Sequence, residues 1–142
     1  MYVSLSQISP SAADAATRSI VTKSIEKNGQ SGLSGALVFS GRYFVQILEG
    51  PEDRVGDLCE TLKADVRHSD LVIINDRPIE RRKFASWRMA FVGPSVFVDR
   101  QVNRLASSPS DGEVVRVAGW LETLLAECDP LATGYHSQKD FQ

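Results

Sequence analysis

The chain has 142 residues, a length that fits one domain of ordinary size with its own hydrophobic core. Hydrophobic residues make up 42% and charged residues 24% of it, so neither a disordered nor a fibrous protein is indicated. The formal charge of −2 argues against a broad basic surface for nucleic acid or an anionic membrane. No apolar run approaches the roughly 20 residues that span a bilayer, and no secretory signal pattern is found. We therefore expect a cytoplasmic protein with neither nucleic acid nor membrane as a partner.

The first half of the sequence predicts a strand, a helix and a β-hairpin. Residues 1–5 favour a strand, and Ser9-Pro10-Ser11 separates it from a helix over 13–28, whose apolar positions recur at helical spacing. Residues 35–39 and 43–48 are rich in β-favouring side chains. The short connection Ser40-Gly41-Arg42 between them indicates a hairpin.

The second half predicts another helix and two more strands. Pro51 is expected in the first turn of a helix that places Val55, Leu58, Cys59 and Leu62 on one face. Residues 71–74 indicate a buried strand and residues 89–92 a further one. The predicted order is thus β-α-β-β-α-β-β.

That order is typical of a ferredoxin-like α+β sandwich, in which one face of the sheet carries two helices. The other face also needs a cover, and the apolar stripe on residues 114–128 predicts a helix there, after a turn at 107–112. We divide the chain accordingly into a domain at 1–96, a C-terminal helical extension at 97–130 and a flexible tail at 131–142.

Few residues indicate chemistry on their own. Gln46 interrupts an apolar strand, and a buried amide without partners would cost about 1–3 kcal/mol, although a half-exposed Gln explains the pattern equally well. Asn28 before Gly29 suits the end of a helix. Cys59 and Cys128 lie in apolar patterns without metal-ligand spacing, and we predict two buried thiols and no metal site. No motif for a phosphate loop, a zinc protease or a hydrolase nucleophile is present.

Several segments, taken together, resemble a known family. They are Tyr2-Val3-Ser4, Asn28 followed by Gly32-Leu33-Ser34-Gly35, Phe44-Val45-Gln46-Ile47-Leu48-Glu49-Gly50, Asp65-Val66-Arg67-His68 and Arg82-Lys83-Phe84-Ala85-Ser86-Trp87-Arg88-Met89. In this order they resemble the BLUF family of blue-light sensors using FAD. The resemblance covers the first two-thirds of the chain, and the C-terminal segment is similar in pattern to the two-helix extension of short, single-domain members.

The resemblance implies a flavin site between the two helices. Ile20 and Leu62 would lie on either side of the flavin ring, and Asn28 at its polar edge. Tyr2 and Gln46 would be hydrogen-bonded to each other and to the flavin. The other implied contacts, to the ring, the ribityl chain or the phosphates, are Lys27, Asp65, Arg67 and His68. FAD is the expected cofactor, with FMN or riboflavin as alternatives.

The same resemblance implies photochemistry without an enzymatic reaction. An electron and a proton would pass from Tyr2 to the excited flavin and return, leaving the Gln46 side chain in a changed tautomer or orientation. Trp87 or Met89 would transmit this change to the C-terminal helices. Because the chain carries no effector domain, a downstream signalling protein is the expected partner, and a homo-oligomer is expected as well.

Two other functions stay open at this point, because a fold alone does not determine a function. The first is a flavin-binding module that does not sense light. The second is an acyl-phosphate hydrolase that would use Arg67 and Asn28 and would purify without a yellow cofactor.

Overall fold

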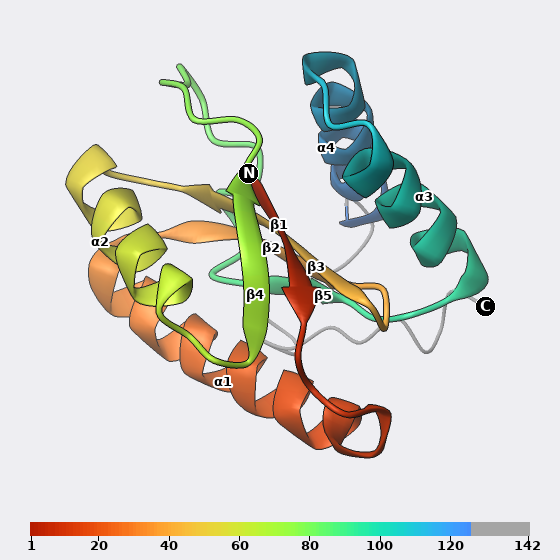
Figure 1. Cartoon of the computed structure of the whole chain (residues 1–142). Coiled ribbons are helices and arrows are strands. Elements are labelled where there is room, and N and C mark those ends of the chain that lie inside the picture. Colours follow the sequence, from red (N-terminus) through yellow and green to blue (C-terminus); the bar gives the residue numbers. More distant parts are fainter. Residues whose placement is uncertain (126–142) are drawn as a thin grey trace.

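The computed structural model describes residues 1–125, which form one five-stranded sheet with helices on both of its faces (Figure 1). The strands are β1 (Tyr2–Ser6), β2 (Ser34–Phe39), β3 (Tyr43–Glu49), β4 (His68–Ile73) and β5 (Ala90–Val92). They lie in the order β4-β1-β3-β2-β5. All neighbours are antiparallel except β2 and β5, which are parallel.

Two helices, α1 (Ala13–Ser31) and α2 (Glu52–Lys63), cover one face of the sheet (Figure 1). A short 3-10 turn at Pro10–Ala12 leads into α1, and the helix ends at Gly32, whose φ of 69° is the left-handed conformation that glycine adopts readily. Pro51 lies at the cap position immediately before α2 rather than inside its first turn. Glu52 and Asp53 follow it, where the helix dipole favours negative charge.

The other face is covered by α3 (Val96–Ser107) and α4 (Asp111–Leu125), two antiparallel helices (Figure 1). Ser95 caps α3 by accepting a hydrogen bond from the Val98 amide at 3.2 Å. Arg116 of α4 donates to Gln101 of α3 and also to the Glu113 carboxylate of its own helix. The C-terminal extension is therefore a helical hairpin.

The sheet separates two hydrophobic cores, because successive side chains of a strand point to opposite faces. The core between α1 and the sheet contains Val21 of the helix and Leu37, Phe39, Phe44, Met89 and Phe91. The core on the α3–α4 side is larger. It joins Val38, Val45, Val92 and other sheet residues, together with Phe84 and Trp87 from the segment before β5, to Val98, Val102, Leu105, Val117, Leu121 and Leu125. The buried side chains of the sheet thus pack into one core or the other, according to the face to which they point.

The predicted ferredoxin-like order and the positions of both helix pairs are confirmed. The prediction that 71–74 form a buried strand is wrong: β4 is an edge strand, and Val72 is 55% and Ile73 41% exposed.

Cys59 is half-buried rather than buried, because its helix does not pack closely on the sheet. Cys128 and the predicted tail lie outside the described residues, and the boundaries at 96 and 130 stay predictions. In residues 1–125 no helix is long and apolar enough to cross a membrane.

Gly35 offers a test of the close packing of β2 against β3. A Cβ atom on Gly35 would lie 1.9 Å from the Ile47 carbonyl oxygen, so the two strands would have to separate. We expect Gly35→Ala to lower the free energy of unfolding by about 3 kcal/mol or more, measured by urea denaturation. Gly56, in α2, has no atom within 4 Å of the corresponding position. As a control, Gly56→Ala should instead raise the free energy of unfolding by about 0.5–1 kcal/mol.

Candidate functional site

Tyr2 and Gln46 form a buried hydrogen-bonded pair on the sheet face below α1 and α2. The two residues lie directly opposite each other on β1 and β3, and each is only 5% exposed. The Tyr2 hydroxyl donates to Gln46 Oε1, and Gln46 Nε2 lies 3.8 Å from Met89 Sδ, a weak acceptor. Burial raises the pKa of Tyr2, so this phenol holds its proton at physiological pH. The predicted partnership of Tyr2 and Gln46 is therefore present in the fold.

A cavity opens next to this pair, between α1, α2 and the sheet. It is lined by Tyr2, Ile20, Lys23, Ser24, Lys27, Asn28, Leu37, Phe44, Gln46, Leu58, Thr61, Leu62, Asp65, Arg67 and His68. All the residues that were predicted to contact a cofactor are among them. Their contacts with a cofactor stay predictions, but the fold brings them together around one space.

Helix α2 forms one wall of this cavity and does not pack closely against the sheet. None of its residues is buried, although Val55, Leu58, Cys59 and Leu62 form an apolar face. An amphipathic helix normally buries that face against the core, but here Leu58 and Leu62 of the face line the cavity instead. The apolar face of α2 is thus available to a flat, apolar ligand.

Asn28 places an unsatisfied amide oxygen at the cavity. Its side chain is 2% exposed, and Nδ2 donates to the Arg88 carbonyl at 2.7 Å. No donor within residues 1–125 reaches Asn28 Oδ1. Leaving such an acceptor unpaired costs about 1–3 kcal/mol, so this oxygen is suited to accept an N–H from a ligand.

His68 joins β1 to the end of α2. Its Nε2 lies 2.5 Å from the Leu62 carbonyl oxygen and its Nδ1 2.7 Å from Ser4 Oγ. Because a carbonyl only accepts, Nε2 is the donor, and a neutral ring then accepts the Ser4 hydroxyl at Nδ1. This bridge positions Leu62 at the cavity wall.

Positive charge gathers at the mouth of the cavity. Lys23 and Lys27 are one helical turn apart on α1, and Arg67 lies across from them after α2. Arg67 also donates to both oxygens of Asp65. These hydrogen bonds lower the pKa of Asp65 to about 2, so the carboxylate remains ionised and keeps the guanidinium in place.

Trp87 and Met89 lie on opposite faces of the sheet. Met89 is in the core below α1, next to Gln46, whereas Trp87 packs in the core below α3 and α4 and does not line the cavity. The backbone between them is attached to the site, because Asn28 binds the Arg88 carbonyl and the Gly35 amide donates to the Trp87 carbonyl at 3.0 Å. One short segment therefore contacts both cores.

Glu49 is a functional candidate that the sequence reasoning missed. Its carboxylate, on a side chain 6% exposed, accepts the backbone N–H groups of Lys83 and Phe84 at 3.0 Å each. It thereby attaches the segment before Trp87 to the end of β3. Lys23 and Leu58 were also missed, although each lies one helical turn before a predicted residue, Lys27 and Leu62.

Known proteins are similar to this chain over its N-terminal part. The sequence model of the family described as "BLUF: Sensors of blue-light using FAD" matches residues 1–90. The "Photoactivated adenylate cyclase subunit beta" of Euglena longa is 34% identical over 71 residues, which are 49% of this chain and 8% of that protein. The "Blue light- and temperature-regulated antirepressor BluF" of Escherichia coli K12 is 41% identical over 46 residues, 32% of this chain and 11% of that protein. The chain thus spans a small part of these relatives.

Solved structures match the whole arrangement of the sheet and its helices. The structure described as "BlrB - a BLUF protein, dark state structure" superposes with a TM-score of 0.73 at 26% identity, over 87% of this chain and 93% of that one. The structure "BlsA photo-activated state" gives a TM-score of 0.75 over 85% of this chain and 91% of that one. At 21% identity, this match shows a similar fold. Because the family match spans well over half of the sequence, the chain belongs to the BLUF family, the sensors of blue light using FAD.

Proposed function

We propose that this chain is a blue-light photoreceptor that holds a flavin noncovalently between α1 and α2 and has no enzymatic activity of its own. The observation on which the proposal rests is the buried hydrogen bond from Tyr2 to Gln46 at the wall of a cavity. A tyrosine can give up an electron and a proton, and the amide beside it can rearrange its hydrogen bonds in response. Family membership supports the flavin as the light-absorbing group.

The residues around the cavity fit a flavin. The isoalloxazine ring is flat and largely apolar, and it would fill the space between Ile20 on α1 and Leu62 on α2. The polar edge of the ring offers N–H and C=O groups, which match the unpaired Asn28 Oδ1 and the weakly bonded Gln46 amide. A bound flavin would therefore complete both the apolar contact of α2 and the hydrogen bonds of two buried amides.

The charge at the mouth of the cavity favours a flavin with a phosphate group. Lys23 and Lys27 form no ion pair with any residue of the described part of the chain, and Arg67 suits an anion through its planar set of donors. FAD and FMN carry phosphate at the end of the ribityl chain, away from the ring, and riboflavin does not. Because the family is described as using FAD, we infer that FAD is the natural cofactor and that FMN can replace it.

When bound, the flavin would absorb blue light and accept an electron from a nearby aromatic residue. Loss of an electron makes a phenol strongly acidic, so the Tyr2 proton would move along its hydrogen bond toward Gln46 Oε1. Gln46 would pass through a second tautomer or rotate, and its Nε2 would lose or change the contact with Met89 Sδ. Return of the electron and the proton restores Tyr2, while the altered Gln46 side chain stores the signal.

The signal would cross the sheet through the segment between Lys83 and Met89. Its Met89 end contacts Gln46, its middle is bound by Asn28 and Gly35, and Trp87 packs against the core of α3 and α4. Glu49 holds the other end of the segment. A change at Met89 would thus alter the packing of Trp87, and α3 and α4 would present that change to a downstream protein.

The alternatives have less support. An acyl-phosphate hydrolase is not supported by the family model that matches residues 1–90, which describes light sensors using FAD. A light-insensitive flavin module would not require the Tyr2–Gln46 pair to be buried together. In several relatives the matched region is a small part of a photoactivated adenylate cyclase subunit, so the cyclase activity is not carried over to this chain.

Tyr2→Phe is the first test of the photochemistry. The variant lacks the hydroxyl that donates to Gln46, and we expect it to bind flavin but to lose the red shift of the visible absorption spectrum that blue light produces in the wild type. Tyr43→Phe is the matched control, because Tyr43 faces the opposite side of the sheet. A Tyr2→Phe protein that shifts like the wild type would contradict the proposal.

The charge at the cavity mouth predicts a preference among flavins. Replacing Lys27 with Gln is expected to weaken FMN binding about two- to fivefold, since an exposed cation contributes up to about 1 kcal/mol, and to leave riboflavin binding unchanged. Fluorescence titration measures both. Lys63→Gln is the control, because Lys63 pairs with Glu60 outside the cavity. Equal weakening of FMN and riboflavin would argue against a phosphate contact.

Trp87 and Met89 are expected to have separable effects on the signal. Met89→Leu removes the sulfur next to Gln46 and should alter the flavin spectrum itself. Trp87→Phe leaves Gln46 untouched and should keep the light-induced spectral shift while reducing the light-dependent change in hydrogen exchange of α3 and α4. If Trp87→Phe and the wild type show the same exchange change, the proposed route through Trp87 is wrong.

A further inference from the structure

Residues 82–84, shortly before β5, connect several elements of the fold. The Arg82 guanidinium donates at 2.8 Å to the carbonyl of the glycine that caps α1. The Lys83 ammonium pairs with Glu122 of α4 at 3.7 Å. The Phe84 ring, only 1% exposed, lies in the core on the α3–α4 side. This short stretch therefore joins the flavin side of the sheet to the helical hairpin.

Glu49, at the end of β3, holds the backbone of this stretch. One carboxylate oxygen accepts the Lys83 N–H and the other accepts the Phe84 N–H, each at 3.0 Å. Hydrogen bonds to an ionised acceptor are stronger than those between neutral groups. A carboxylate accepts at both oxygens, whereas a glutamine amide accepts at only one. The side chain is 6% exposed, so water competes little for the two N–H groups.

The attachment leaves only a short length of chain before the flavin site. The Trp87 amide donates to the Phe84 carbonyl at 3.0 Å, which closes a turn directly after the attached residues. Two residues further on, Met89 Sδ contacts the Gln46 amide. If residues 83–84 were free, they could absorb a displacement at Met89 by moving with it. Because they are held, Trp87 must take up the displacement.

The ion pairs of the hairpin are too exposed to replace this attachment. Within residues 1–125, two pairs join α3 or α4 to another part of the chain: Arg77 with Asp111 at 2.6 Å, and Lys83 with Glu122 at 3.7 Å. The four side chains are between 47% and 74% exposed, where solvent weakens an ion pair. The connection to the helices therefore depends on the buried side chains of the segment more than on charge.

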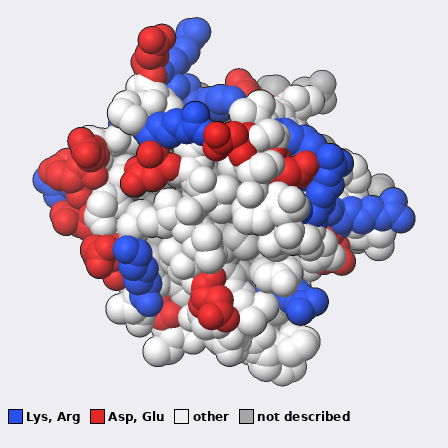
Figure 2. All heavy atoms as spheres, turned by 45° about the horizontal axis from the view of Figure 1, so that its top comes forward, with Lys and Arg blue, Asp and Glu red and all other residues white. Residues whose placement is uncertain are grey.

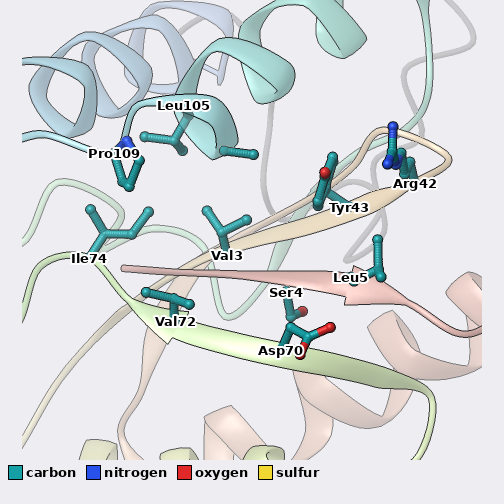
Figure 3. Close-up of a pocket in the computed structure, with 11 residues that line it drawn as sticks. Val3, Ser4, Leu5, Arg42, Tyr43, Asp70, Val72, Ile74, Leu105 and Pro109 are labelled. Atoms are coloured by element: carbon teal, nitrogen blue, oxygen red, sulfur yellow. The ribbon is translucent and has the colours of Figure 1, made fainter.

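The hairpin is not packed on the sheet along its whole width. A cavity of about 270 Å³ lies between β1, β4 and the end of α3, where Leu105, Ala106 and Pro109 line it (Figure 3). Arg42 and Asp70 also line it, and neither pairs with α3 or α4 within residues 1–125. In the space-filling view, the centre of the face is largely uncharged and charged side chains gather at its margin (Figure 2). This edge of the hairpin has room to move.

We propose that Glu49 is a positioning residue for the light signal. It fixes the backbone at Lys83 and Phe84, so that the rearrangement at Gln46 displaces Trp87 and reaches α3 and α4. The inference rests on the proposed light sensing and adds to it the residue that decides whether the signal leaves the flavin site. Glu49 does not line the flavin cavity, so its effect on the output is separable from the photochemistry.

Glu49→Gln tests the attachment in the flavin-loaded full chain. The glutamine keeps the size of the side chain, accepts at one oxygen only and turns its own N–H groups toward one of the two donors. In the dark, hydrogen exchange of the Lys83 and Phe84 amides should accelerate roughly tenfold or more. The light-induced red shift should be kept, and α3 and α4 should lose most of their light-dependent change in exchange.

Two controls separate the backbone attachment from charge. Glu80→Gln makes the same chemical change on an exposed side chain of the same connection and should behave like the wild type. Lys83→Gln removes the ion pair with Glu122 but keeps the Lys83 N–H, and it should also keep the response of α3 and α4. If Lys83→Gln loses the response as fully as Glu49→Gln does, the ion pair carries the signal and the proposal is overturned.

The wild type offers a test that needs no variant and decides the matter if Glu49→Gln does not fold. Under continuous blue light, the Lys83 and Phe84 amides should keep their dark protection, while exchange of the Trp87 amide changes. Loss of protection at Lys83 and Phe84 in the light would overturn the proposal. So would a full response of α3 and α4 in Glu49→Gln, or none in the wild type. A wild type without a red shift would instead refute the light sensing, and this inference with it.

Discussion

The hydrogen bond from the Tyr2 hydroxyl to Gln46 is the interaction on which the rest of the site depends. A primary amide in the middle of an apolar sheet is costly unless its polar atoms are paired, and β1 places Tyr2 directly across from it. The register of two strands therefore brings together the donor and the amide. One residue of slip would send each side chain to the opposite face of the sheet.

The sheet both separates and connects the two halves of the molecule. The site lies below α1 and α2, and the larger core lies below α3 and α4. In a regular strand Trp87 and Met89, two residues apart, would point to the same face. They point to opposite faces because residue 87 precedes β5 and its backbone is bound by Gly35 rather than by a continued ladder. The irregular start of β5 is what allows one short segment to contact both sides.

The sequence predicted the elements whose signals are local. The hairpin at Ser40-Gly41-Arg42 and the order of helices and strands along the chain follow from turn residues and periodicity, and the grouping of Asn28, Gln46 and Leu62 followed from a family resemblance. What it did not predict depends on tertiary placement. The apolar run 71–74 suggested burial, but whether a strand is central or at an edge is decided by strand order and by the extent of the covering helices. The role of Glu49 depends on backbone N–H groups more than thirty residues away, and no local pattern indicates such a contact.

The lack of any buried side chain on α2 has a consequence for the life of the protein in a cell. Helix α2 would rely on the ligand as if the ligand were part of the hydrophobic core. A chain without flavin would open first at α2, the region with the fewest buried contacts, while the helical hairpin on the other face kept its packing. Binding of the ligand to the folded state alone would stabilise it by mass action. The abundance of the protein would then follow the supply of flavin, because proteases remove chains that open readily.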